Sequence, residues 1–227
     1  MWYTAVGGMR VERIFQIMEL VGTVAFAISG VIAGVRHHMD VFGTTVLGLV
    51  TAVGGGIVRD MMIGRLPPTV FLHPLCAVVA LLTSLLLFFL MYILKTEAGT
   101  RLKRWEDILL FVTDTVGLGV FTVLGIETTA QAGYTGKAML LFVGIITGIG
   151  GGIFRDVFSG VIPAVFRKHI YALASAAGAL VYVLLMPYVS NRICMPAGFI
   201  TVVVIRICAN IFKWDLPIVG GKENGGK

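Results

Sequence analysis

A ten-residue stretch that occurs twice constrains this chain more than any other feature. Residues 51–60 read Thr-Ala-Val-Gly-Gly-Gly-Ile-Val-Arg-Asp, and residues 147–156 read Thr-Gly-Ile-Gly-Gly-Gly-Ile-Phe-Arg-Asp. The match continues downstream at an offset of 96 residues, in the pairs Gly64/Gly160, Pro67/Pro163 and His73/His169. Upstream the offset is 95, in the pairs Glu19/Asp114, Gly22/Gly117, Phe26/Phe121 and Gly30/Gly125. The chain is therefore a duplicated unit with one residue gained in a loop.

The composition places this duplicated unit in a membrane. Of 227 residues, 57% are hydrophobic and only 13% are charged, whereas soluble domains carry about a quarter charged residues. The chain has room for about seven transmembrane helices of roughly 20 residues and for little else. The net charge of +6 could suggest nucleic-acid binding, but the basic residues lie between apolar spans. That distribution favours the positive-inside rule, so we expect no nucleic-acid partner.

Seven apolar runs, separated by charged or Pro/Gly-rich breaks, are predicted to span the bilayer. They lie at about 14–35, 41–63, 74–94, 106–126, 137–159, 169–189 and 193–212. We interpret residues 1–227 as a single all-α transmembrane domain, with repeat A at about 14–94 and repeat B at about 106–189. The seventh helix is an addition outside the repeat. The tail at 218–227 is Gly-rich and polar, and we expect it to be disordered.

The number of spans in each repeat predicts how the two repeats are related. Three is odd, so the second repeat enters the membrane from the side opposite to the first. Such an inverted three-plus-three repeat is characteristic of proteins that move solutes through a site near the midplane. Sorted by side, five Lys and Arg residues fall on the side of the N-terminus and ten on the opposite side. This asymmetry predicts an outer N-terminus and a cytoplasmic C-terminus.

The two glycine triplets are predicted to lie near the middle of the bilayer. They consist of Gly54, Gly55 and Gly56 in repeat A and of Gly150, Gly151 and Gly152 in repeat B. Each glycine costs on the order of 1 kcal/mol of helix propensity relative to alanine, so a triplet marks a point where a helix can kink or open. Carbonyls released there must line protein or a water-filled cavity, where they become cation ligands. The alternative is close helix packing, but two symmetric triplets, each followed by Arg-Asp, favour an ion pathway.

The charged residues after the triplets are expected to face the bundle interior, because lipid exposure costs several kcal/mol. They are Arg59, Asp60, Arg155 and Asp156. Adjacent helical residues do not face each other, which favours pairing across the axis, Arg59 with Asp156 and Arg155 with Asp60. The alternative is an arginine that extends to the membrane surface. Arg206 has no repeat mate, and we expect it to form a salt bridge that holds the last helix to the bundle.

Polar residues on the first two helices of each repeat complete the candidate pathway. They are the acids Glu19 and Asp114 and the hydroxyl residues Ser29, Thr51 and Thr147. Hydroxyls in membrane helices more often bond to their own backbone than to a ligand. We find no G-x-S-x-G, Walker, H-E-x-x-H or Rossmann pattern in a usable context, so we expect no enzyme activity and no cofactor. Cys76, Cys194 and Cys208 lack the spacing of a zinc site.

Three segments resemble the prokaryotic relatives of the trimeric intracellular cation channels, sequences that are also labelled as a glycine-transporter domain or UPF0126 family. They are the twin Gly-Gly-Gly-x-x-Arg-Asp motifs, the run Phe-Ala-Ile-Ser-Gly at 26–30 with Ala-Gly-Val-Arg at 33–36, and Trp-Asp-Leu-Pro at 214–217. The resemblance covers about Ile14 to Pro217. It implies seven transmembrane helices, a homotrimer, and a pore in each protomer that conducts potassium and other monovalent cations.

In that family the second and fifth helices kink at the glycine motif, which here corresponds to Gly54–Gly56 and Gly150–Gly152. Animal members carry basic residues on the fourth helix that are linked to gating and to phosphoinositide. The fourth span of this chain has Asp114 and no Lys or Arg in its interior, so the resemblance does not extend to that control.

The sequence therefore predicts a membrane channel for monovalent cations, mainly potassium, embedded in a lipid bilayer. One alternative is a secondary carrier for glycine or another small solute, because inverted repeats also support alternating access. Another is a non-transporting scaffold in which the glycines only pack. On the channel interpretation, Gly55→Ala or Gly151→Ala alters conductance more than folding, and on the scaffold interpretation the reverse holds.

Overall fold

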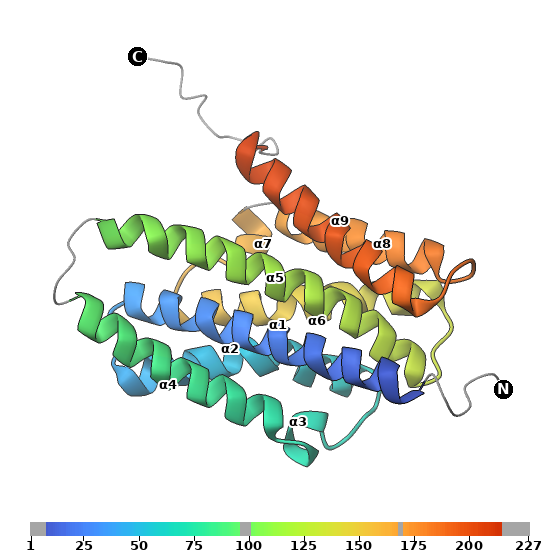
Figure 1. Ribbon diagram of the computed structural model, residues 1–227, viewed down its shortest axis with the longest axis horizontal. Helices are drawn as coiled ribbons and strands as arrows, with labels where there is room; N and C mark the ends of the chain where they lie inside the picture. The colour runs from blue at the N-terminus through green and yellow to red at the C-terminus, as the bar shows by residue number, and fades with distance from the viewer. Residues whose placement is uncertain (1–7, 96–100, 168–169, 215–227) are drawn as a thin grey trace.

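The computed structural model describes residues 8–95, 101–167 and 170–214, which form a bundle of long helices (Figure 1). The first half contains α1 (Gly8–Arg36), α2 (Val41–Met62), the short α3 (Thr69–Leu72) and α4 (Leu75–Lys95). The second half contains α5 (Arg101–Gln131), α6 (Lys137–Phe158), the short α7 (Ala164–Arg167) and α8 (Ile170–Leu185). The last described helix is α9 (Asn191–Ile211).

The helices confirm the predicted all-α membrane fold. In the described part of the chain, 6 helices are long and apolar enough to cross a membrane, and α8 is a shorter apolar helix. Most helix ends lie within a few residues of their predicted positions. The largest differences are in α1, which begins at Gly8 rather than near 14, in α5, which extends at both ends beyond the predicted 106–126, and in α8, which ends at Leu185. The short α3 and α7 were not predicted, and the tail at 218–227 lies outside the described residues.

The two halves repeat the same order of elements and the same local endings. Gly64 after α2 and Gly160 after α6 both have φ of 72°. The next amide donates back to the carbonyl of the aspartate, Arg65 to Asp60 at 2.8 Å and Val161 to Asp156 at 3.0 Å. A left-handed glycine with this bond is a common helix ending, because glycine has no Cβ to clash. The repeat therefore preserves backbone geometry as well as sequence.

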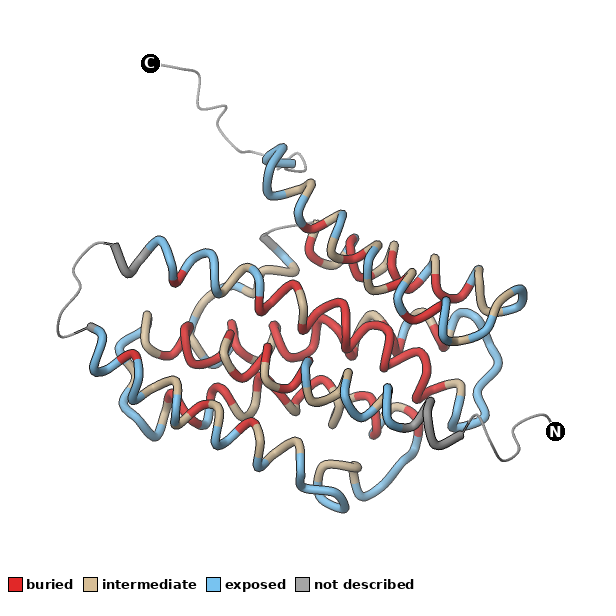
Figure 2. The backbone as a smooth tube through the Cα atoms, viewed as in Figure 1, coloured by how far each residue is buried: buried red, intermediate tan, exposed pale blue. Residues whose placement is uncertain are grey.

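The first two helices of each half form the centre of the bundle. Buried residues concentrate on α1, α2, α5 and α6 (Figure 2), whereas only 17% of the apolar window of α4 is buried. Where α1 crosses α5, the repeat mates Phe26 and Phe121 stack with ring centroids 5.2 Å apart. Gly22 makes room for Phe121 and Gly117 for Phe26. The central crossing is thus built from residues that match between the halves.

A second crossing brings α2 and α6 into backbone contact at the middle glycine of each triplet. A Cβ on Gly55 would overlap the carbonyl oxygen of Thr147, and a Cβ on Gly151 would overlap that of Thr51. Both helices continue through their triplets without interruption, so the expected helix opening is not seen in this structure. Close packing, the alternative explanation, accounts for Gly55 and Gly151.

This crossing predicts that neighbouring glycines of one triplet differ in their tolerance of alanine. Gly55→Ala must separate α2 from α6, because its methyl group meets backbone, and we expect a loss of about 1–3 kcal/mol of stability. Gly56→Ala is the matched control: its Cβ would make only an ordinary contact with the Arg59 side chain, at 3.8 Å, and alanine favours the helix. Thermal melting of both variants in one detergent tests this. Equal melting temperatures would contradict the proposed role of the crossing.

Candidate functional site

A cavity with several polar side chains on its wall lies in the first half of the bundle, near the end where α1 begins. It has a volume of about 670 Å³, is open to the outside, and lies between α1, α2, α3 and the start of α4. Its polar lining consists of Gln16, Glu19, Thr23, Arg59, Asp60, Thr69 and His73. Glu19 is half-buried and has no hydrogen bond or ion pair within the described part of the chain. An ionisable residue without a partner on an apolar, membrane-spanning helix is by default a functional-site hypothesis.

Arg59 and Asp60 form a buried pair on the wall of this cavity. The Arg59 Nε donates to Asp60 Oδ1 at 2.9 Å, and its Nη2 lies 2.8 Å from the same oxygen. The other carboxylate oxygen accepts the backbone N–H of Thr69 at 2.7 Å, where α3 begins. The pair is therefore neutral and also fixes the start of α3.

Repeat B contains the same arrangement. The Arg155 Nε donates to Asp156 Oδ1 at 2.8 Å, and Asp156 Oδ2 accepts the N–H of Ala164 at 2.7 Å, where α7 begins. The prediction that these charges pair across the axis was wrong. The argument from neighbouring Cβ directions failed for two reasons: the arginine side chain is long enough to fold back, and each aspartate is held near its arginine by the first amide of a short helix.

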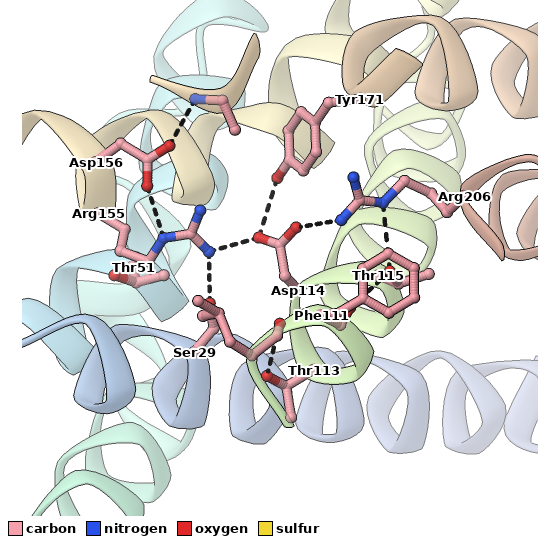
Figure 3. A network of polar contacts seen from close by, with 12 residues as sticks. Ser29, Thr51, Phe111, Thr113, Asp114, Thr115, Arg155, Asp156, Tyr171 and Arg206 are labelled. Carbon is pink, nitrogen blue, oxygen red and sulfur yellow. Dashed lines mark hydrogen bonds and ion pairs between the residues drawn. The ribbon is translucent and has the colours of Figure 1, made fainter. Parts of the chain in front are cut away.

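Asp114 is the centre of a larger network in repeat B (Figure 3). Its Oδ1 accepts from Arg155 Nη1 at 2.5 Å and from the Tyr171 hydroxyl at 3.3 Å. Its Oδ2 accepts from Arg206 Nη2 at 2.9 Å, which confirms the predicted salt bridge of the last helix. The Arg155 Nη1 also donates to the Ser29 hydroxyl of α1 at 2.5 Å. The network thus joins five helices: the carboxylate of α5 bonds directly to α6, α8 and α9, and Arg155 links it to α1.

Aromatic rings enclose the guanidinium of Arg206. Its carbon atom lies 5.0 Å from the ring centroid of Phe111 and 4.8 Å from that of Tyr171. Its Nε donates to the Thr115 hydroxyl at 3.3 Å. Cation–π contacts and the ion pair together hold this arginine in an interior position.

The two halves therefore differ at equivalent positions. Glu19 lines an open cavity, whereas its mate Asp114 is bound by two arginines and a tyrosine. Tyr171 corresponds to Leu75 at the offset of 96, and its hydroxyl lies close to the position that a Cβ on Gly152 would take. Gly56, the mate of Gly152, has no such neighbour. In repeat B, side chains occupy the space that remains open in repeat A.

The remaining predicted site residues have structural partners. The hydroxyls of Thr51 and Thr147 donate to their own helices, to the carbonyls of Leu47 and Val143, each at 2.6 Å. Gly54 lies against the ring of Phe154, and Gly150 lies against Gly55. These four residues belong to the α2–α6 crossing rather than to the cavity.

Sequence reasoning missed Tyr171 and one polar cluster. Tyr171 could have been found by aligning the repeats, since a tyrosine replaces Leu75 there. The cluster surrounds Glu127, which is buried and accepts from Tyr182 at 2.5 Å, from Asn191 at 2.8 Å and from Gln131 at 3.0 Å. Its repeat mate is the apolar Ile32, so the repeat pattern gave no signal for it. This cluster joins α5, α8 and α9 at the end of the bundle where α9 begins.

The two acids that correspond between the repeats should differ in their effect on stability. Asp114→Asn leaves Arg155 and Arg206 buried without their shared counter-charge, and we expect a loss of roughly 3–5 kcal/mol. Glu19→Gln removes a charge that has no ion partner, so its melting temperature should stay near that of the unmodified protein. Thermal unfolding in one detergent compares the two variants. A Glu19→Gln protein as unstable as Asp114→Asn would show that Glu19 has a structural partner.

Comparison with known proteins agrees with the internal repeat. The family model described as "Glycine transporter" matches residues 16–92 and again residues 111–187. The chain is 38% identical over 213 residues to the UPF0126 inner membrane protein YadS of Escherichia coli, which covers 92% of this chain and 97% of that protein. It is also 38% identical to a UPF0126 membrane protein of Deinococcus radiodurans, over 83% of this chain and 84% of that one.

Solved structures share the fold. A trimeric intracellular cation (TRIC) channel orthologue from Rhodobacter sphaeroides superposes with a TM-score of 0.79 at 29% identity, covering 88% of this chain and 99% of its own. A second structure, described in terms of conductance through TRIC cation channels, has a TM-score of 0.77 at 32% identity and covers 94% and 100%. These relatives are membrane proteins and channels, not enzymes. The chain belongs to the UPF0126 family of membrane proteins, matches the glycine-transporter family model twice, and has the fold of the prokaryotic TRIC cation channels.

Proposed function

We propose that this protein is a channel for monovalent cations, mainly potassium, with a pathway in each protomer of a homotrimer. The observation that carries the proposal is the cavity of about 670 Å³ with the unpaired Glu19 on its wall. A carboxylate in a cavity with low-dielectric walls concentrates cations and repels anions. The similar solved structures are cation channels, two of them described as TRIC channels and one as a TRIC channel orthologue.

The proposed pathway begins in the cavity and passes the α2–α6 crossing toward Asp114. It includes Gly56, Arg59 and Asp60 on the cavity side and Ser29, Gly152, Arg155 and Asp156 on the far side. Between the two sides, Gly55 and Gly151 hold the helices in backbone contact. In the proposed channel this is the closed conformation, since the two helices touch at the crossing and two arginines neutralise Asp114. Conduction requires the two helices to separate and at least one arginine to leave Asp114.

A specific observation supports the carrier alternative. Glu19 and Arg59 line the same cavity, so a zwitterionic amino acid could place its ammonium group at the glutamate and its carboxylate at the arginine. The description of the matching family model, a glycine transporter, names such a solute. A carrier predicts saturable uptake of glycine into proteoliposomes with no unitary current. The channel predicts unitary currents that far exceed any carrier turnover.

The cavity carboxylate should control conductance. We expect Glu19→Gln to lower the unitary potassium conductance and the preference for cations over anions. Gln16→Glu, which adds a second carboxylate to the same cavity, should raise both. Both effects should shrink between 0.1 M and 1 M salt, because the screening length falls from about 10 Å to about 3 Å. Planar-bilayer recordings under a potassium/sodium gradient measure this. Unchanged conductance in both variants, with normal folding, would remove Glu19 from the pathway.

We also propose that the protein lies in a prokaryotic cell membrane with α1 beginning outside and α9 ending in the cytoplasm. The basis is the count of five against ten basic residues on the two sides. Single cysteines in a variant without Cys76, Cys194 and Cys208 test the orientation. A cysteine at Lys137 should react with an impermeant reagent added outside intact cells, and a cysteine at Lys213 only after lysis. The opposite pattern would reverse the assignment.

A further inference from the structure

A second polar pocket lies at the end of the bundle where α9 ends, separate from the cavity of Glu19. It has a volume of about 270 Å³ and lies between α5, α8 and α9. Its polar or aromatic lining consists of Phe111, Tyr171, Arg206, Asn210, Lys213 and Trp214. Among the described lining residues there is no aspartate or glutamate, and all five polar side chains can donate hydrogen bonds. The chemistry of this pocket is that of an anion site.

Arg206 has donor capacity that its protein partners do not use. Its Nε donates to Thr115 and its Nη2 to Asp114. The second amino group, Nη1, has no hydrogen-bond or ion-pair partner in the described part of the chain, and Figure 3 shows it pointing away from Asp114. The arginine is only 9% exposed. A buried guanidinium held in place, with one free amino group beside a pocket, is preorganised for an anionic oxygen.

The chain ends α9 so that a second cation reaches the same pocket. Lys213 has φ of 49°, the left-handed conformation that follows many helices. The N–H of Trp214 then bonds back to the carbonyl of Ala209 at 3.1 Å. This turn places Lys213 and the half-exposed Trp214 beside Arg206 on the pocket wall. Glycine suits this conformation better than lysine, so packing of the helix end alone does not call for lysine.

We propose that this pocket binds an anionic phosphate group, carried by a phospholipid or free in solution. Arg206 supplies a rigid donor, Lys213 a mobile cation, and Asn210 and Trp214 additional neutral donors. The end of a membrane-spanning helix is the level at which lipid headgroups lie, and tryptophan is enriched there. Two cations without an acidic residue on the pocket wall favour a group with net negative charge over a zwitterionic headgroup. The site does not depend on cation conduction.

The phosphate would share Arg206 with Asp114. Asp114→Asn removes the competing carboxylate, so the guanidinium becomes fully available to the ligand and the affinity for phosphate should rise. Lys213→Gly removes the second cation while suiting the left-handed turn, so it should weaken binding about tenfold without unfolding the helix end. Lys137→Gln, an exposed lysine at the opposite end of the bundle, is the matched control and should bind as the parent does.

Trp214 provides a local readout. The chain has 3 tryptophans, so Trp2→Phe with Trp105→Phe leaves Trp214 as the only indole. We expect its fluorescence to change saturably when inorganic phosphate replaces chloride at constant ionic strength in detergent. In nanodiscs, phosphatidylglycerol should change it more than phosphatidylcholine alone. A response to phosphatidylglycerol only would support the site and identify its ligand as lipid, and a response to both probes would support it for either source.

No response to either probe would overturn the proposal. A response that Lys213→Gly leaves unchanged, or that Lys137→Gln reduces equally, would also overturn it, because the anion would then bind elsewhere. Should Asp114→Asn fail to fold, the comparison of Lys213→Gly with Lys137→Gln remains decisive. None of these measurements involves ion flux, so failure of the proposed channel function would leave the result of this test intact.

Discussion

The backbone contact between α2 and α6 is the constraint on which the rest of the bundle depends. Gly55 meets the carbonyl of Thr147 and Gly151 meets that of Thr51, so the two helices approach more closely than any side chain allows. The threonine hydroxyls bond to their own helices and are thereby kept out of this contact. A small shift of either helix changes both halves at once, because each triplet packs against the other repeat.

An inverted repeat does not make the two halves equivalent, and the differences are local. Repeat B has Tyr171 where repeat A has Leu75, and this tyrosine puts a phenol beside Asp114. The unrepeated α9 adds Arg206 to the same carboxylate. Repeat A has no tyrosine at this position and no added helix that carries an arginine, so Glu19 faces a cavity. The duplicated backbone supplies the scaffold, and a few unmatched side chains decide that Glu19 lines a cavity whereas Asp114 is bound by two arginines and a tyrosine.

The fold could be predicted from the sequence because its signals are strong and local. Apolar runs of about 20 residues identify membrane helices, and the offset of 95 to 96 residues reveals the repeat. The pairing of charges could not be predicted in the same way. The pairing depends on the backbone amides that bind the two aspartates: Thr69 in α3 binds Asp60, and Ala164 in α7 binds Asp156. These short helices give no periodic signal in the sequence. The role of Gly55 likewise depends on a tertiary crossing that propensity alone does not reveal.

The last helix shows how a segment outside a repeat can control the repeated unit. Carboxylates of α5 hold α9 near both of its ends: Glu127 through Asn191, and Asp114 through Arg206. These two acids differ in kind. Glu127 is satisfied by neutral donors and has an apolar repeat mate, which fits a structural anchor. Asp114 is paired with two cations: Arg155, which belongs to α6, and Arg206, which lines the pocket at the end of α9. An event that repositions Arg206 therefore removes one of the two counter-charges of Asp114, while Glu127 keeps α9 attached through Asn191. In this way α9 can act on the network of repeat B without leaving the bundle.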